Sequence, residues 1–337
     1  MHHREQTLAD SPHRAPVMLL VAALLFIPAH AQAGFWARIE VRLNAVDIVS
    51  GEDRHGALAG VADHRAFRLS SPDPRFGGLS GAVWLDGQLH VTSDRGTLFR
   101  ADPVFDDQGL LSDLRNWQAA ELRDPEIRHA HLDVEALAGG GAQRLTIALE
   151  DQRTLRVLDL AGSAAEMELS GHVTGFRDLG GNEGIEGLCT SPNGDLLAFS
   201  EGETHGDGRA VSRTSGEASA LLSYRTANGF AVTGADRLGS TIFVLERRFG
   251  ILAGWQARVS RFPATSLDVD VGPIVPERLV HLHSPVRMDN FEAIAMRKTG
   301  DDRPVATLLS DDNFSPLQET LLLDLALADR QSPDRAE

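Results

Sequence analysis

Acidic residues recur at two fixed places in this sequence. Five segments each contain a short apolar strand, a polar turn and a second apolar strand, and every second strand ends in an acid: Asp94, Glu150, Glu201, Glu246 and Asp311. The residue after the leading apolar residue of each first strand forms a second set: Ser80, Glu135, Glu186, Thr233 and Glu292. Carboxylates that converge raise one another's pKa unless a cation or arginines lie among them.

A hard cation with oxygen ligands is one resolution of such a cluster, and Ca²⁺ is abundant outside the cell. The ligands expected for it are six carboxylates: Asp94, Glu135, Glu186, Glu292, Asp311 and Asp312. Arginine pairing is the other resolution, weighed equally, because Arg95, Arg247 and Arg248 directly follow two of the strand-end acids. The same three arginines are the candidates for binding an anionic substrate.

The histidines and the cysteine give weaker signals. His129 and His131 have strand-like spacing, as do His281 and His283, but neither pair has a third ligand nearby at metal-site spacing, so surface or core roles are favoured. Cys189 is the only cysteine, which excludes an internal disulfide and favours a small buried apolar side chain.

The elements that must position the acids repeat along the chain. The aligned positions are separated by 47 to 59 residues, the period of a four-stranded propeller blade, and each repeat has room for two outer strands. The expected fold is an all-β β-propeller with five blades. In a five-bladed ring, Ala66–Leu69 would pair with the last repeat and close the ring. The alternative is a sixth blade built from residues 35–76 and the C-terminus. A β-sandwich is less favoured because it lacks this longer period.

The chain divides into four expected segments. Residues 1–33 have the layout of a signal peptide, with an apolar run from Val17 to Ile27 and the motif Ala31-Gln32-Ala33. Residues 34–64 form an N-terminal segment that could take part in ring closure, residues 65–327 the propeller, and residues 328–337 a disordered tail. The apolar run is too short to span a bilayer, so the mature protein is expected to be periplasmic or secreted, with no membrane span.

The net charge of the chain limits the classes of molecule that it can bind. The formal net charge is −16, and Lys298 is the only lysine. Such a chain repels nucleic acid and attracts cations, so nucleic acid is excluded as a partner. A small anionic ester or a component of the cell envelope is expected instead.

Several of the repeated motifs resemble one known family. They are Gly77-Gly78-Leu79-Ser80-Gly81, Ser93-Asp94-Arg95-Gly96, Asn182-Glu183-Gly184-Ile185-Glu186-Gly187-Leu188, Asp289-Asn290-Phe291-Glu292-Ala293-Ile294 and Leu309-Ser310-Asp311-Asp312-Asn313-Phe314-Ser315. This set is similar to the bacterial phytase-like family, described as "esterase-like activity of phytase", over roughly residues 65–327. The sequence departs from the family at Thr233-Gly234, where relatives tend to carry an acid.

The resemblance implies an exported propeller with esterase or phosphoesterase activity. The β-propeller phytases to which the family is similar bind Ca²⁺ at one mouth of the channel and use it in metal-assisted hydrolysis. A hydrolase of this kind, with its site at the channel mouth, is therefore the expected function. The alternative is a non-catalytic binding or scaffold propeller of the cell envelope, in which the acids only support the fold.

Overall fold

The computed structural model describes residues 35–49, 54–127, 132–141, 143–150, 154–162, 164–173, 176, 184–216, 218–268 and 272–328. The expected signal peptide, most of the expected tail, and His129, His131, Asn182 and Glu183 lie outside these ranges. Within them, none of the helices has the length and apolar character needed to cross a membrane.

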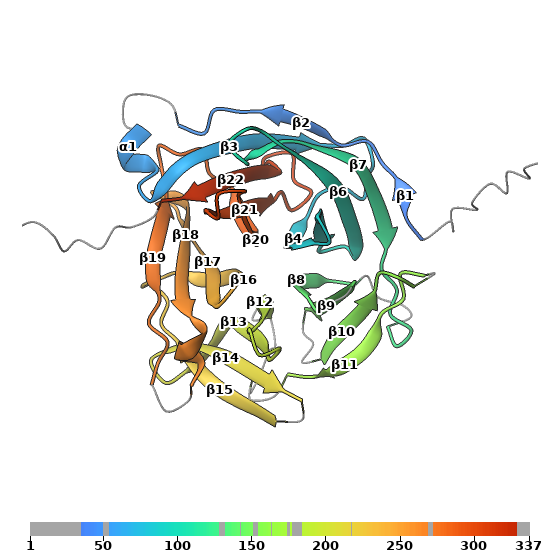
Figure 1. The fold of residues 1–337 in the computed structure, drawn as a ribbon, viewed down its shortest axis with the longest axis vertical. Helices are drawn as coiled ribbons and strands as arrows, with labels where there is room; N and C mark the ends of the chain where they lie inside the picture. The colour runs from blue at the N-terminus through green and yellow to red at the C-terminus, as the bar shows by residue number, and fades with distance from the viewer. Residues whose placement is uncertain are drawn as a thin grey trace, which may run out of the picture. The chain divides into compact units, whose positions relative to one another are not determined.

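Strands form five antiparallel sheets, arranged as the blades of a propeller (Figure 1). Blade 1 comprises β4 (Leu79–Leu85), β5 (Gln88–Ser93), β6 (Thr97–Phe105), β7 (Leu111–Glu121) and β1 (Ala37–Arg38). Blade 2 comprises β8 (Val134–Gly139), β9 (Arg144–Leu149), β10 (Thr154–Asp159) and β11 (Glu168–His172). Blade 3 comprises β12 (Ile185–Thr190), β13 (Leu196–His205), β14 (Gly208–Ser215) and β15 (Ala218–Tyr224).

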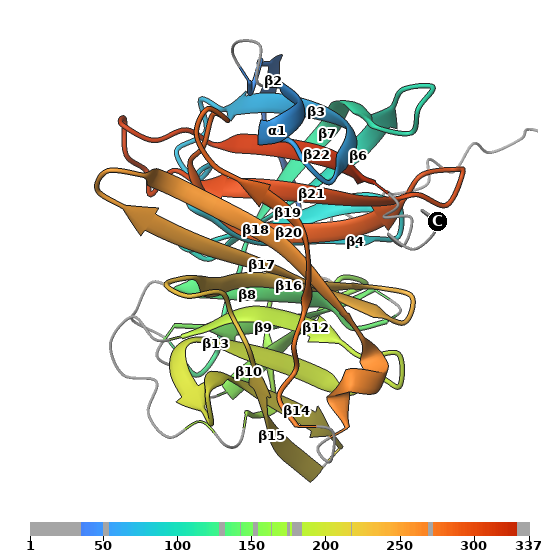
Figure 2. The ribbon, with the colours of Figure 1, turned by 90° about the vertical axis from the view of Figure 1, so that its left-hand side faces the viewer.

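Blade 4 comprises β16 (Ala231–Leu238), β17 (Thr241–Gly250), β18 (Gly254–Pro263) and β19 (Glu277–Leu282). Its β17–β18 hairpin projects at one edge, on the left of Figure 2. Blade 5 comprises β20 (Asn290–Lys298), β21 (Pro304–Asp311), β22 (Leu321–Leu327), β3 (Val61–Ser70) and β2 (Arg42–Ala45). The helical elements in the described ranges are short: α1 (Arg54–Ala57) and the 3₁₀ turn η1 (Ala264–Leu267).

The prediction of an all-β propeller is confirmed, with five blades and not six. The early segment closes the ring, because β3 pairs with β22 from Leu321↔Arg68 to Leu327↔Val61. The residues that could have started a sixth blade instead add outer strands to existing sheets. β2 extends blade 5 and β1 extends blade 1, so no separate sheet forms from them.

Apolar side chains fill the spaces between successive blades. Each of the five large core clusters draws its residues mainly from two neighbouring blades, as in the cluster that joins Cys189 and Phe199 of blade 3 to Val232 and Ile242 of blade 4. Cys189 is thus buried, as expected, and is a free thiol. Both faces of the inner strands are covered, which explains why these strands are continuous apolar runs.

The innermost strands of the five sheets are β4, β8, β12, β16 and β20, and they surround the centre of the ring (Figure 1). Every inner strand pairs with the second strand of its blade as an antiparallel hairpin. The beginning of each inner strand therefore lies beside the end of the second strand. The leading residues of the inner strands and the strand-end acids therefore meet at one mouth of the channel.

Candidate functional site

A β-bulge interrupts every inner hairpin at the same place. The pairing register shifts by one residue in all five, and the residues left unpaired are Ser80, Glu135, Glu186, Thr233 and Glu292. A bulge re-aims the side chain of the extra residue, and bulges are frequent next to functional sites. The position that the sequence alignment singled out is thus the position where the backbone departs from regular pairing.

The channel at this level is very narrow. Ser80, Glu186 and Glu292 line a cavity of only about 10 Å³, about the smallest that holds one water molecule. Ser80 is 3% exposed, and its hydroxyl has no hydrogen-bond partner among the residues that the structure describes. A buried hydroxyl without a partner is costly and indicates that another group belongs beside it.

Three carboxylates gather beside this cavity. Single oxygens of Glu135, Glu150 and Glu186 all lie within 4.8 Å of one another. Gly184 makes the space for them, because a Cβ atom there would lie 2.7 Å from Oε2 of Glu150 and 3.2 Å from Oε1 of Glu186. Two inner-strand bulges and the end of β9 therefore build one cluster, which we call the carboxylate triad.

Burial and like charge raise the pKa values of Glu135 and Glu186, two members of the triad. Burial, followed by the charges of Glu186 and Glu150, raises the pKa of Glu135 to about 11. Burial raises the pKa of Glu186 well above its ordinary value, and the charges of Glu292, Glu201 and Glu150 add to this effect. A divalent cation would offset this repulsion, and carboxylate oxygens are the ligands that hard cations prefer. The triad could therefore hold a metal ion.

Arg247 neutralises the other side of the mouth. Its guanidinium pairs with Glu292 and donates to Asn290 Oδ1, and its Nη2 lies 3.2 Å from Oε1 of Glu201. Burial still raises the pKa of Glu292, while Arg247 opposes the rise. Arginine pairing, one of the two resolutions expected from the sequence, is thus present at Glu201 and Glu292, whereas the triad is a cluster of carboxylates that could bind a metal ion.

Asp94 and Asp311 lie between these two parts. Burial, together with the charge of Asp133, raises the pKa of Asp94 to about 6, although Ser93 donates a hydrogen bond to it. Asp311 is 5% exposed, and burial and the charge of Glu292 raise its pKa to about 8. Asp94 also adds to the shift at Asp311, so the two carboxyl groups interact.

Asp312, the remaining expected ligand, forms hydrogen bonds that hold segments together at the mouth of the channel. Its Oδ1 accepts hydrogen bonds from the backbone N–H groups of Gly78 and Phe314, each at 3.0 Å. Its Oδ2 accepts from the Thr320 hydroxyl at 2.8 Å. The Gly78 bond joins blade 5 to the start of blade 1, and the other two bonds hold the β21–β22 connection of blade 5, so Asp312 has a structural role in the fold.

The other two arginines expected at the site, Arg95 and Arg248, contact aromatic rings. The Arg95 guanidinium lies over the Phe314 ring, 3.5 Å from its centroid, and Arg95 lines a cleft together with Asp94 and Asp133. Arg248 lies on the outer side of the β17–β18 hairpin, where it stacks on Phe230 and donates to Gln256 Oε1 at 2.8 Å. Of the three expected arginines, only Arg247 forms an ion pair with an acid of the mouth within the described ranges.

Blade 4 contributes Arg247 to the mouth, and its bulge residue and strand-end acid both form structural hydrogen bonds. Thr233, at its bulge, donates to the Phe291 carbonyl of blade 5 at 3.1 Å. Its strand-end acid, Glu246, is 1% exposed and accepts a hydrogen bond from the Tyr224 hydroxyl at 2.8 Å. The departure from the family pattern at Thr233 is thus accompanied by two structural bonds and by Arg247.

The second histidine pair contacts neighbours that explain it without a metal. His281 and His283 stack with ring centroids 4.8 Å apart, and Nε2 of His281 lies 3.0 Å from Gln256 Oε1. Burial, aided by the charge of Arg258, lowers the pKa of His281 to about 4. The pair therefore belongs to the packing of blade 4.

Glu150, Glu201 and Asp133 are functional-site residues that the sequence pattern did not predict. Glu150 and Glu201 occupy the same strand-end position as Asp94 and Asp311, so the alignment carried the signal for both. Asp133 directly precedes the inner strand β8, and its charge acts on Asp94 and Glu135. Nothing in the repeat pattern marked that position.

Comparison with protein families gives one match. The family model described as "Phytase-like: Esterase-like activity of phytase" matches residues 74–314, which include every residue of the mouth named above. No curated protein matches the chain.

Solved structures with a similar arrangement include several enzymes. An α-L-arabinofuranosidase from Clostridium thermocellum is 10% identical, with a TM-score of 0.46, and the match covers 75% of this chain and 91% of the other. A gluconolactonase from Xanthomonas campestris is 10% identical, with a TM-score of 0.41 and coverage of 87% and 97%. An inactive variant of virginiamycin B lyase from Staphylococcus aureus is 11% identical, with a TM-score of 0.37 and coverage of 86% and 100%.

Proposed function

This chain belongs to the phytase-like family, and we propose that it is an exported, metal-assisted ester or phosphoester hydrolase whose reaction centre is the channel mouth. The carboxylate triad is the observation that carries the proposal, because three acids whose oxygens lie within 4.8 Å of one another can ionise together only beside a compensating charge. The orphaned Ser80 hydroxyl beside Glu186 is a second, independent sign that a ligand completes this site.

Glu135, Glu150 and Glu186 would hold the cation, and Ca²⁺ is the ion we propose, since its ligands are oxygens and its supply outside the cell is high. Such an ion would polarise the carbonyl or phosphoryl oxygen of the substrate and favour deprotonation of water. Binding requires the triad to lose its protons, so affinity should increase with pH.

Asp94 and Asp311 are suited to move protons in the reaction. Two neighbouring carboxyl groups whose pKa values are pushed apart can act as base and acid. With a pKa of about 6, Asp94 is mostly ionised at pH 7 and can accept a proton from the attacking water. With a pKa of about 8, Asp311 is mostly protonated and can donate to the leaving oxygen as the ester C–O or P–O bond breaks. The products are an acid and an alcohol, and the proton count is conserved.

The proposed substrate is a small anionic ester. Arg247 already compensates Glu201 and Glu292, which leaves Arg95 as the cation suited to the substrate's negative charge. The proposed location, periplasmic or secreted, rests on the layout of residues 1–33 and on the supply of Ca²⁺ outside the cell.

A non-catalytic envelope propeller is the second candidate. It is favoured by the number of mouth residues with structural bonds, among them Asp312, Thr233 and Glu246. In that case a cation at the triad would only stabilise the ring.

Calcium titration of the purified protein tests the main proposal. We expect Ca²⁺ to raise the melting temperature by several degrees and to support hydrolysis of p-nitrophenyl esters or p-nitrophenyl phosphate. Glu186→Gln should abolish both effects while the metal-free variant melts close to wild type, because a neutral Gln amide of the same size replaces a carboxyl group whose pKa burial raises well above its ordinary value.

Glu168→Gln, on the exposed edge strand β11, is the matched control and should retain both responses. If Ca²⁺ neither stabilises the protein nor supports hydrolysis, the hydrolase proposal is wrong. Stabilisation without hydrolysis would favour the envelope propeller.

A further inference from the structure

The channel cannot accept the body of a substrate. The cavity lined by Ser80, Glu186 and Glu292 has a volume of about 10 Å³, which admits a water molecule or an ion but no organic group. An ester that reacts at the triad must therefore lie across the mouth, with its leaving group outside the ring.

A cleft adjoins the mouth between blades 1 and 2. Its inner part, of about 470 Å³, is lined by Asp94, Arg95, Leu132 and Asp133. Its outer part, of about 840 Å³, also includes Arg95 and Leu132, so the two parts are continuous. These volumes are typical of sites for small molecules. The cleft therefore leads directly from Asp94, at the mouth, to the outer edge of the ring.

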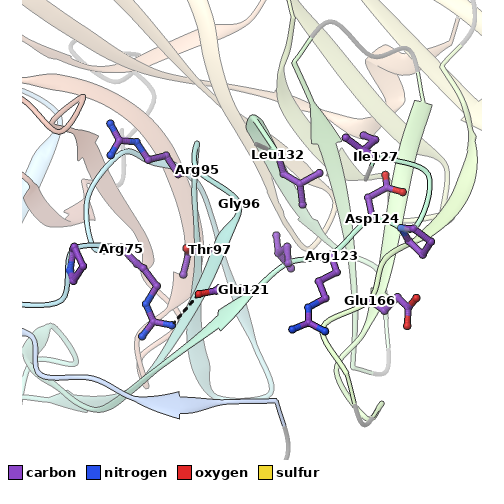
Figure 3. Close-up of a pocket in the computed structure, with 13 residues that line it drawn as sticks. Arg75, Arg95, Gly96, Thr97, Glu121, Arg123, Asp124, Ile127, Leu132 and Glu166 are labelled. Carbon is purple, nitrogen blue, oxygen red and sulfur yellow. Dashed lines mark ion pairs between the residues drawn. The ribbon is translucent and has the colours of Figure 1, made fainter. Parts of the chain in front are cut away.

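The two walls of the outer part differ in character (Figure 3). Arg95 and the Arg75–Glu121 pair lie on one side. Leu132 and Ile127 lie on the other, together with the charged residues Arg123, Asp124 and Glu166. Leu132 and Ile127 belong to the apolar cluster between blades 1 and 2, so their exposed atoms offer a fixed apolar surface.

Most charges along the cleft already have partners. Asp124 pairs with buried Arg156 at 2.5 Å, and Arg75 pairs with Asp73 at 2.7 Å. Arg95 has no ion pair with any residue that the structure describes, and Phe314 holds its guanidinium at the mouth end of the cleft. Among the described residues, the cleft thus offers Arg95 near the acids, and Arg123 with an apolar surface farther out.

We propose that this cleft binds a monoester that carries one anionic group. Arg95 holds the anion, and Leu132 and Ile127 contact the aryl or alkyl body of the leaving group. This inference rests on the proposed function for the reaction, but the binding itself does not need turnover. A substrate with several phosphates is disfavoured, because Asp94 and Asp133 line the same inner part and would repel further negative charge.

Binding of phenylphosphonate and methylphosphonate to the Ca²⁺-loaded protein tests the inference without hydrolysis. Isothermal titration calorimetry should show phenylphosphonate binding at least about tenfold more tightly, because only its ring reaches the apolar wall. Arg95→Gln should weaken both ligands about tenfold. Ile127→Ser should weaken phenylphosphonate alone. Both residues are at least partly exposed, so the variants should fold, which their melting temperatures check.

Arg261→Gln, an exposed arginine of blade 4, is the matched control and should bind both ligands like wild type. Equal affinity for the two phosphonates, or no effect of Arg95→Gln and Ile127→Ser, would overturn the inference even if the protein hydrolyses esters. Selective binding that the variants abolish, in a protein without hydrolase activity, would leave the cleft as a ligand site and overturn the proposed reaction instead.

Discussion

At the scale of single residues, the acids of the mouth fall into two groups: those that pair with an arginine and those that lie only beside other acids. Arg247 compensates Glu201 and Glu292, whereas neither Glu135 nor Glu186 has an ion pair with an arginine in the described ranges. The side chains of Arg247, Glu201 and Glu292 are 18%, 23% and 15% exposed. Because all three are largely buried, loss of one partner leaves charge that water does not solvate well.

Replacing Arg247 should therefore be costly. We expect Arg247→Met to lower the free energy of unfolding by about 3 kcal/mol at pH 8, because Glu201 and Glu292 lose their compensating charge. Adding Glu292→Gln should restore part of that loss. Denaturant titration of the single and double variants measures both effects.

Arg261→Met provides the comparison, since Arg261 and Glu277 form an exposed pair with side chains 36% and 43% exposed. Its effect should be about 1 kcal/mol or less. An effect of Arg247→Met no larger than this would show that the acids at the mouth do not depend on the arginine.

At the scale of elements, a small residue follows each bulge and lets neighbouring inner strands approach. These residues are Gly81, Ala136, Gly187, Gly234 and Ala293. At Gly81 a Cβ atom would lie 2.8 Å from the Leu137 Cβ and 2.9 Å from the Leu137 backbone nitrogen, both in blade 2. The narrow channel thus depends on the absence of side-chain bulk at the bulges.

Gly81→Ala should accordingly destabilise the ring. We expect the free energy of unfolding to fall by roughly 1–3 kcal/mol, because blade 2 must shift to admit the methyl group. The metal response should weaken as well, since the shift moves β8, which carries Glu135. Chemical denaturation with and without Ca²⁺ measures both quantities.

Gly171→Ala is a suitable control on the edge strand β11, where a Cβ atom would meet nothing within 4 Å. It should be neutral or slightly stabilising. Wild-type stability in Gly81→Ala would mean that the inner strands are not in tight contact.

At the scale of the whole molecule, one blade joins the early and late parts of the described chain. β3 and β22 pair within blade 5, and Asp324 of β22 is fully buried. Asp324 pairs with Arg297 and accepts hydrogen bonds from the Thr307 hydroxyl and, at 2.8 Å, from the Leu111 N–H of blade 1. Ring closure therefore uses strand pairing and a buried polar network together.

The crowding of acids at the mouth predicts how stability depends on pH. Asp94, Asp311 and Glu135 have pKa values raised to about 6, 8 and 11 in the fold. The folded protein then binds more protons than the unfolded chain above about pH 4, so stability falls as pH rises. In metal-free buffer the melting temperature should decline between about pH 4 and pH 8, and Ca²⁺ should reverse the decline. A melting temperature that rises with pH in EDTA would contradict this electrostatic account.

The sequence by itself determined the repeat. The period of 47 to 59 residues, the apolar inner strands and the acids at two aligned positions predict five blades and one acidic mouth. These features are local, because apolar patterning and turns act over a few residues, and the same pattern returns in each blade. The family resemblance rests on those same residues.

Only the tertiary structure decided which acids meet. Arg247 reaches Glu201 and Glu292 across 46 and 45 positions of sequence, and Asp312 reaches Gly78 across 234. The sequence predicts Asp312 as a metal ligand and does not include Glu150 among the ligands. In the fold, Asp312 accepts hydrogen bonds from three donors, and Glu150 belongs to the triad. Which side chains meet across the ring depends on the bulges and on the small residues that let neighbouring strands approach. The sequence of a single repeat does not contain the distances between residues of different blades.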